Sequence, residues 1–299
     1  MSTLNRAFIK ALRNPTAAPT LVPAPHINTA AVSSPARAAG PIAAAHTAVG
    51  PISVGQASGI GTLPAPPPRS VTARTPLRPV FEVQRMTWPP IAISLLREAA
   101  DQWGAVVADL SLAAKRSENL VLITSHGRGE GRSTLMCCLI RLLAAGGLSS
   151  ALVDADFGHG QLARQLRLLP QAGWAGVLTG ELPLAEALIE SVEDHVTLLP
   201  LQGPLADRQL PRNNPRMGAS LQRLRGAYDV VLVDGGPAEV TSPADFESLL
   251  TAAQFDAAII VRDVRGTSAE ATSDLSRRLS AAGISKLDVA ENFVAGNLS

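Results

Sequence analysis

Short runs of consecutive apolar residues recur along the chain after residue 117. A strand that is buried on both faces of a sheet is apolar at every position, whereas a strand with one solvated face alternates. Segments with apolar residues at helical spacing lie between most of these runs, as expected of parallel strands joined by helices. The pattern therefore predicts an α/β fold with a doubly wound, mostly parallel sheet. The runs occupy residues 120–123, 151–153, 196–199, 230–233 and 258–261.

An amphipathic segment precedes the first of these runs. Apolar side chains recur at helical intervals over residues 91–115, which predicts one helix packed on the edge of the domain. We therefore predict a single folded domain over residues 81–299. Within it, residues 81–116 are expected to form a helical extension and residues 117–294 the nucleotide-binding core.

The first 80 residues differ in composition from the rest of the chain. Residues 1–80 contain 13 of the 23 prolines, 17 alanines and seven basic residues, but no Asp or Glu. Because this composition cannot bury a core, the segment is predicted to be a disordered Pro/Ala-rich basic tail. The other residues carry 26 − 7 = 19 basic and 25 acidic side chains. A basic tail is thus joined to an acidic body.

Charge and cysteine content exclude several classes of protein. The acidic balance of the body argues against a nucleic-acid-binding surface. Cys137 and Cys138 are adjacent in an apolar segment and offer no disulfide framework, so we expect a reducing cytoplasm and a packing role for both. No apolar run approaches the roughly 20 residues that span a bilayer, and the chain is expected to be soluble.

A glycine-rich loop, SHGRGEGRST, follows the first apolar run and precedes a helical pattern. Glycines allow backbone N–H groups to turn toward an anion, and the start of a helix adds partial positive charge at the same place. The loop therefore predicts a binding site for the phosphates of a nucleotide. Its candidate binding residues are Gly129, Glu130, Gly131, Arg132, Ser133 and Thr134.

Arg132 departs from the usual phosphate-loop pattern, which has lysine at this position. Lysine is a compact point charge, whereas arginine is a longer planar fork that places its donors differently. We expect the substitution to preserve phosphate binding better than turnover, and we include Arg132 among the candidate catalytic residues. The alternative for this loop is a strand-to-helix turn that binds nothing.

Three aspartates follow two of the apolar runs. Asp154 and Asp156 end the second run, and Asp234 ends the fourth. Because open α/β sheets bind ligands at the carboxyl edge of their strands, these carboxylates are expected to converge beside the glycine loop. A hydroxyl such as that of Ser133 and an aspartate are the usual protein ligands of Mg²⁺ in phosphoryl-transfer sites. The sequence therefore predicts a magnesium site at this edge.

Two other kinds of site explain less of the sequence. A dinucleotide-binding loop would account for Asp154 as a ribose-binding acid, but it requires glycine where Arg132 stands. The five histidines lack the spacing of metal ligands, and the chain has no Cys-x-x-Cys motif.

The motifs together resemble those of the bacterial tyrosine kinases of capsule and exopolysaccharide synthesis, relatives of the MinD/ParA partition ATPases. The glycine loop is similar to that family's S-x-x-P-G-E-G-K-S-T, with Arg128 and Arg132 in place of Pro and Lys. LVDADF at residues 152–157 and YDVVLVD at residues 228–234 resemble its Walker A′ and Walker B strands. The resemblance covers nearly all of residues 117–294 and implies a MinD/ParA-like P-loop NTPase fold.

The chain also departs from the family at three further places. Gly158 stands where an arginine is usual, the C-terminal residues contain no tyrosine cluster, and the E-x-x-R-x-x-R ring-assembly helix has no counterpart in residues 101–109. The single tyrosine, Tyr228, opens an expected core strand. These departures leave transfer to tyrosine open.

The resemblance implies roles for individual residues. Asp154 would act as the base toward a tyrosine hydroxyl, and ATP and Mg²⁺ would be the cofactors. The implied metal ligands are Ser133, Asp156 and Asp234, and the implied nucleotide contacts beyond the loop are Arg262 and Asn292.

The resemblance also implies a partner and a location. A transmembrane polysaccharide chain-length or export protein would bind the chain, which would be cytoplasmic and peripheral at the inner face of the membrane, as a homodimer or weak oligomer. Three functions stay open: a tyrosine-protein kinase of exopolysaccharide biosynthesis, an ATPase switch of MinD/ParA type, and a nucleotide-binding scaffold without catalysis that regulates polysaccharide export.

Overall fold

A computed structural model describes residues 76–98, 100–202 and 214–293. All of them belong to one of the two compact units into which the chain divides, and the other unit, residues 16–67, lies outside the described residues. The predicted tail at residues 1–80 lies almost wholly outside them too, so its disorder stays a prediction.

The described residues form one sheet of eight strands in the order β1-β4-β5-β3-β6-β2-β7-β8. Neighbouring strands are parallel except for β4 and β5, which pair antiparallel. This arrangement confirms the predicted α/β fold with a mostly parallel sheet. In sheet order the strands are β1 Phe81–Val83, β4 Ile189–Ser191, β5 Val196–Leu199, β3 Ser150–Asp154, β6 Val230–Pro237, β2 Leu120–Ser125, β7 Ala257–Asp263 and β8 Lys286–Asn292.

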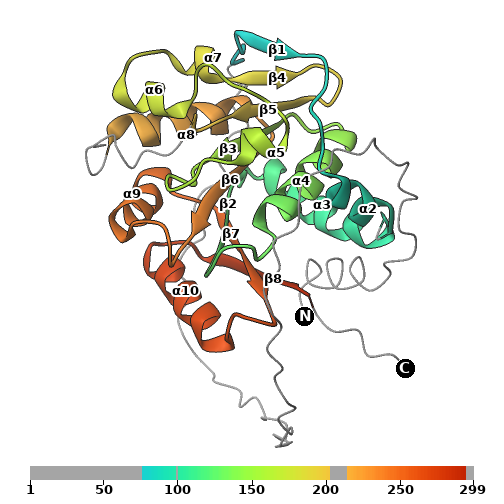
Figure 1. Cartoon of the computed structure of the whole chain (residues 1–299), viewed down its shortest axis with the longest axis vertical. Helices are drawn as coiled ribbons and strands as arrows, with labels where there is room; N and C mark the ends of the chain where they lie inside the picture. Colours follow the sequence, from blue (N-terminus) through green and yellow to red (C-terminus); the bar gives the residue numbers. More distant parts are fainter. Residues whose placement is uncertain (1–75, 99, 203–213, 294–299) are drawn as a thin grey trace, which may run out of the picture. The chain divides into compact units, whose positions relative to one another are not determined.

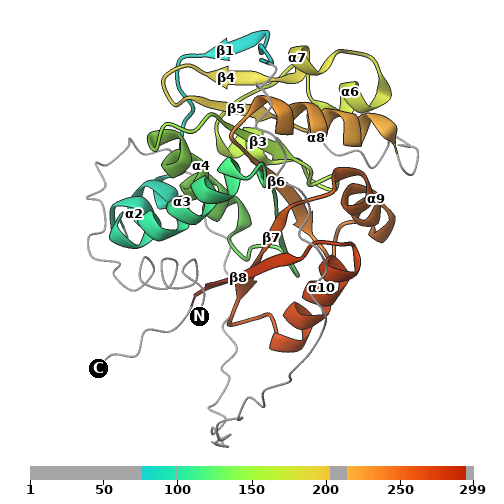
Figure 2. The same cartoon turned by 180° about the vertical axis from the view of Figure 1, so that it is seen from behind.

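Helices cover both faces of the sheet (Figures 1 and 2). One face packs against α2 (Pro90–Glu98), α3 (Ala100–Lys115), α4 (Arg132–Ala145) and α5 (Leu162–Gln165). The other packs against α6 (Trp174–Thr179), α7 (Leu184–Ala187), α8 (Pro215–Ala227), α9 (Pro243–Ala253) and α10 (Ala269–Ala281). The fold is therefore doubly wound around a central sheet.

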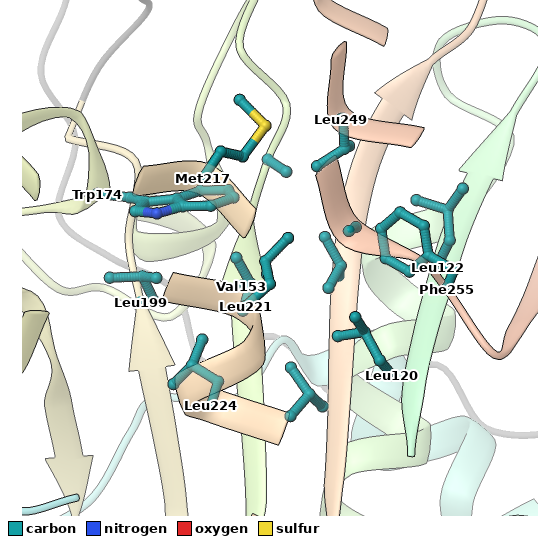
Figure 3. Close-up of a cluster of buried hydrophobic side chains, with 14 of the residues drawn as sticks. Leu120, Leu122, Val153, Trp174, Leu199, Met217, Leu221, Leu224, Leu249 and Phe255 are labelled. Carbon is teal, nitrogen blue, oxygen red and sulfur yellow. The ribbon is translucent and has the colours of Figure 1, made fainter. Parts of the chain in front are cut away.

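The strands next to the glycine loop are buried on both faces, as their continuous apolar runs predicted. In β2, Val121 and Ile123 belong to the core under α2–α5, whereas Leu120 and Leu122 belong to the core under α6–α10. Figure 3 shows part of this second core: Trp174 lies beside Met217 of α8 at one side of the cluster, and Leu249 of α9 lies at the other side with Leu120 and Leu122 of β2.

The helix that follows the glycine loop is almost entirely embedded. Cys137 and Cys138 of α4 are both fully buried, which confirms their expected packing role. Burial raises the pKa of each thiol to about 12. Helix α4 is thereby held firmly between the sheet and the outer helices α2 and α3.

The segment predicted as a helix over residues 91–115 is helical on both sides of residue 99, which lies outside the described residues. Helix α2 ends at Glu98 and α3 begins at Ala100. Both helices bury apolar residues of the predicted pattern, such as Leu95 and Trp103, in the same core.

Strand order places the candidate residues at one edge. The strands β3, β6 and β2 are adjacent and parallel, so their carboxyl ends meet. In the sheet register Asp154 of β3 pairs with Asp234 of β6, and Ile123 of β2 pairs with Asp234. The glycine loop leaves β2 at this edge, directly beside the two carboxylates.

Candidate functional site

The glycine loop connects β2 to α4, as the sequence predicted. Gly129 has φ of 74° and Gly131 has φ of 100°, which is the left-handed region that favours glycine. Gly131 immediately precedes α4 and provides no side-chain cap for its first turn. The loop therefore places the uncapped start of a 14-residue helix at the site, an arrangement suited to an anion.

Glu130 connects the loop to the end of β7, the strand next to β2. Its carboxylate is buried, with Oε1 accepting from the Gly127 amide and Oε2 accepting from the Asp263 amide at 2.9 Å. Asn292 Nδ2 donates to the Glu130 carbonyl oxygen at 2.9 Å. The two side chains, both expected to bind nucleotide, are thus turned toward the protein and tie the loop to the ends of β7 and β8.

Arg132 is the central side chain of the site and is only 9% exposed. Its Nε donates to Asp234 Oδ1 at 3.0 Å, and its Nη2 donates to Asp156 Oδ2 at 3.3 Å. Its Nη1 donates to Ser125 Oγ at 2.6 Å. One guanidinium therefore bridges the carboxylates that end two neighbouring strands and is held by a hydroxyl on a third side.

The carboxylates are crowded and buried. Burial, followed by the charge of Asp234, raises the pKa of Asp154 to about 8. The same two causes raise the pKa of Asp156, against the opposing charge of Arg132. Removing charged groups from water is costly unless they are paired, so the pairing with Arg132 compensates part of this cost.

Asp154 lies deeper than its two neighbours. It is 1% exposed, and its oxygens accept from the backbone amides of Asp156 and Leu162. These contacts fix the turn that follows β3. The carboxylate expected to act as a base is in this structure a group that holds the backbone around Asp156.

A cavity of about 620 Å³ opens in front of the loop. Residues 128–134, Asp156 and Asp234 line it on one side, and the start of α2 with Trp88 lines it on another. Arg164 and Arg167, on and just after α5, lie exposed at its rim. This volume is within the usual range for small-molecule sites, and the basic rim favours an anionic ligand.

The structure brings most of the predicted residues together, but not all. The described residues that line the cavity include the loop, Asp156 and Asp234, but not Asp154, Arg262 or Asn292. Arg262 donates from Nε to the Thr267 carbonyl oxygen and pairs with Glu291 at 3.2 Å. These three residues surround the site rather than face the cavity.

Sequence reasoning missed three contributors. Ser125 was noted only as the first residue of the loop, although its hydroxyl accepts from Arg132. Trp88 and Arg164 carry no motif, because they come from separate segments that only the fold brings to the cavity. The one signal in the sequence was the position of Ser125, just after a predicted buried strand and seven residues before Arg132.

The described residues contain no group of three or more His, Cys, Asp or Glu side chains arranged to hold a metal ion. None of the helices in the described ranges is both long and apolar enough to cross a bilayer.

The described residues share their fold with solved kinase domains. The kinase domain of Escherichia coli tyrosine kinase ETK superimposes with a TM-score of 0.57 at 20% identity, over 68% of this chain and 78% of that domain. The VpsO kinase domain gives a TM-score of 0.55 at 22% identity, over 67% of this chain and 98% of that domain.

Comparison of the amino-acid sequence with those of known proteins identifies relatives of part of this chain. EpsB of Ralstonia nicotianae, named as a tyrosine-protein kinase, is 30% identical over 125 residues, which cover 40% of this chain and 16% of EpsB. The succinoglycan biosynthesis transport protein ExoP of Rhizobium meliloti is 28% identical over 134 residues, 43% of this chain and 17% of ExoP. No family model matches.

The chain is thus a homologue, over the matched segment, of the tyrosine kinases of exopolysaccharide biosynthesis, and the resemblance of its motifs is confirmed. The match spans about a sixth of the length of these relatives.

Proposed function

We propose that the cavity binds ATP through its phosphates. The observation that supports this most is the glycine loop at the start of α4, placed beside Asp156, just after β3, and Asp234 of β6. The amides of residues 129–134 would surround the phosphates, as in other sites at helix N-termini. Arg128, Arg164 and Arg167 at the cavity rim add charge that attracts the triphosphate.

The residues at the site also fit Mg²⁺ by type. Ser133 Oγ, Asp156 and Asp234 are oxygen donors of the kind that Mg²⁺ prefers. Asp156 Oδ1 is buried without a hydrogen-bond partner, and a cation would satisfy it. The ion would neutralise charge on the β- and γ-phosphate oxygens. We propose that these three residues hold it when it is bound.

We propose different roles for the remaining predicted residues. Glu130 and Asn292 position the loop through the sheet, and Asp154 positions Asp156 through the turn after β3. Arg262 stabilises the segment after β7 through Thr267. None of these four side chains needs to touch the nucleotide for its loss to weaken binding.

We propose that the bound ATP serves phosphoryl transfer, with a protein tyrosine as acceptor. EpsB is named as a tyrosine-protein kinase and ETK as a tyrosine kinase, which supports this reaction class. Tyr228, the single tyrosine of the sequence, follows α8 and is only 7% exposed, so the acceptor tyrosine would lie outside this sequence. ExoP is named as a transport protein, which supports a membrane export protein as partner and a place at the inner face of the membrane.

A second candidate function is a nucleotide-binding scaffold without turnover. The contacts of Arg132 support it, because a guanidinium committed to Asp156, Asp234 and Ser125 is not placed between transferring phosphates. An ATPase switch of MinD/ParA type is the third.

One assay separates these functions. The full chain is incubated with Mg²⁺ and ATP labelled at the γ-phosphate, and released phosphate and protein-bound label are measured together, while calorimetry measures ATP affinity. Label on tyrosine supports the kinase, release alone supports the ATPase, and binding without either supports the scaffold. Absence of ATP binding at millimolar concentration would refute the proposal.

A further inference from the structure

The guanidinium of Arg132 occupies the position between the two carboxylates of the candidate metal site. Nε contacts Asp234 and Nη2 contacts Asp156, so a single cation already bridges both acids. The side chain of Arg132 is 9% exposed, that of Asp234 5% and that of Asp156 13%, so all three charged groups are largely buried. Breaking such a pair leaves uncompensated buried charge, so the guanidinium does not leave without a replacement.

A divalent cation at this edge would bind the same two carboxylates. Mg²⁺ requires oxygen ligands at about 2.0–2.1 Å in near-octahedral geometry. Asp234 Oδ1 and Asp156 Oδ2 accept from Arg132, and Asp234 Oδ2 accepts from Ser133 Oγ at 3.5 Å. Asp156 Oδ1 is the one oxygen of the two acids buried without a hydrogen-bond partner. Coordination through Asp234 Oδ1 or Asp156 Oδ2 therefore requires that Arg132 withdraw.

A lysine at this position would not have the same effect. Its ammonium is a single point of charge on a shorter stem, whereas the guanidinium carries five N–H donors in a fixed fork. The fork allows Nε, Nη1 and Nη2 to hold Asp234, Ser125 and Asp156 at once. The change from lysine to arginine thus converts a phosphate ligand into a bridge between acids.

We propose that Arg132 is an internal counter-ion that competes with Mg²⁺ for Asp156 and Asp234, so that this chain gains little affinity for ATP from Mg²⁺. The part of this inference that concerns ATP rests on the proposed function. The competition itself concerns only the protein and the metal.

The first experiment needs no nucleotide. The melting temperature of the full chain is measured in EDTA and in about 10 mM Mg²⁺ for the wild type, Arg132→Met and Arg223→Met. Arg223 is an exposed arginine of α8 and provides the matched control. Arg132→Met should melt at least about 6 °C lower in EDTA, because two buried carboxylates lose their cation.

Mg²⁺ should then rescue only the variant that lacks the internal cation. In Arg132→Met it should recover at least half of the loss, whereas the wild type and Arg223→Met should move by less than about 2 °C. If Arg132→Met does not fold, Arg132→Lys replaces it, with the same expected gain from Mg²⁺. Equal stabilisation of the wild type and the Arg132 variant by Mg²⁺ would overturn the competition.

The second experiment measures ATP affinity by calorimetry in Mg²⁺ and in EDTA. The two dissociation constants should agree within about threefold for the wild type and for Arg223→Lys, and should differ by at least about tenfold for Arg132→Lys. A tenfold gain from Mg²⁺ in the wild type would contradict the inference. Loss of all ATP binding would refute the proposed function instead, and the melting experiment would still decide the competition.

Discussion

Removal of the Glu130 carboxylate should destabilise the fold strongly, although no core side chain is lost. Glu130 is 3% exposed, and its two oxygens accept from the amides of Gly127 and Asp263. A hydrogen bond to a charged group contributes about 1.5–3 kcal/mol, and a buried amide without a partner costs a similar amount. For Glu130→Ala we therefore expect a loss of about 3–5 kcal/mol in the free energy of unfolding.

Urea denaturation measures this loss. With a slope of about 2–3 kcal/mol per molar, the midpoint should fall by about 1–2.5 M. Glu82→Ala in β1, an exposed glutamate, is the matched control and should shift the free energy by less than about 0.5 kcal/mol.

Glutamine provides a sharper test of the geometry. Its single carbonyl oxygen can accept from one of the two amides, and its NH₂ group would face the other. Glu130→Gln should therefore lose at least half of what Glu130→Ala loses. A midpoint within about 0.3 M of the wild type for Glu130→Gln would refute the inference that both oxygens tie the loop to β7.

Three further predictions concern stability. Trp174→Ala should cost about 3–5 kcal/mol by urea denaturation, because the indole is fully buried in the core of Figure 3; a loss below about 1 kcal/mol would contradict that packing. Gly236→Ala should cost at least about 1 kcal/mol more than Gly283→Ala, because both have positive φ but only at Gly236 would a Cβ lie 2.8 Å from Thr241 and 3.0 Å from Asp156; equal losses would refute the steric argument. Asp194→Asn should lower the free energy of unfolding at pH 7. Burial alone would raise the pKa of Asp194, but hydrogen bonds from Ser191, the Met86 amide and Trp88 outweigh burial and lower the pKa below its ordinary 3.8. That contribution is present above pH 3.8 and is lost as pH falls through the lower folded value, so the gap between wild type and variant in thermal melts should close in acid; a gap that persists there would count against it.

The convergence of the loop with Asp156 and Asp234 could be predicted because it depends on a general property of the fold. Continuous apolar runs indicated parallel strands, and parallel strands end at one edge. Ser133 lies in the loop itself, so its place followed directly. For these residues, local pattern and chain topology were sufficient.

The direction of individual side chains could not be predicted. Glu130 lies in the motif next to Gly131, yet its carboxylate binds the Asp263 amide, 133 residues away. Asn292 and Arg262 similarly bind within the protein. Long-range hydrogen bonds leave no periodic trace in a sequence, so a motif identifies the loop without indicating which of its side chains face the ligand.

The short strands β1 and β4 were missed for a related reason. They have three residues each, and β1 pairs with β4, which is distant in sequence, whereas β4 also pairs with the nearby β5. A strand of three residues has too few apolar positions to be distinguished from a loop in the sequence. The antiparallel direction of β4 follows from a tight connection to β5, which periodicity does not reveal.

The two adjacent free cysteines of α4, Cys137 and Cys138, can report local unfolding of this helix. Cys137 and Cys138 have no exposed surface, and a pKa of about 12 leaves almost no thiolate at neutral pH. A thiol-specific dye can therefore react only when local unfolding exposes these thiols. The labelling rate then measures how often α4 unfolds locally. Since α4 begins at Arg132, we expect a ligand bound at the loop to slow this labelling, and the labelling rate would then report binding without any engineered probe.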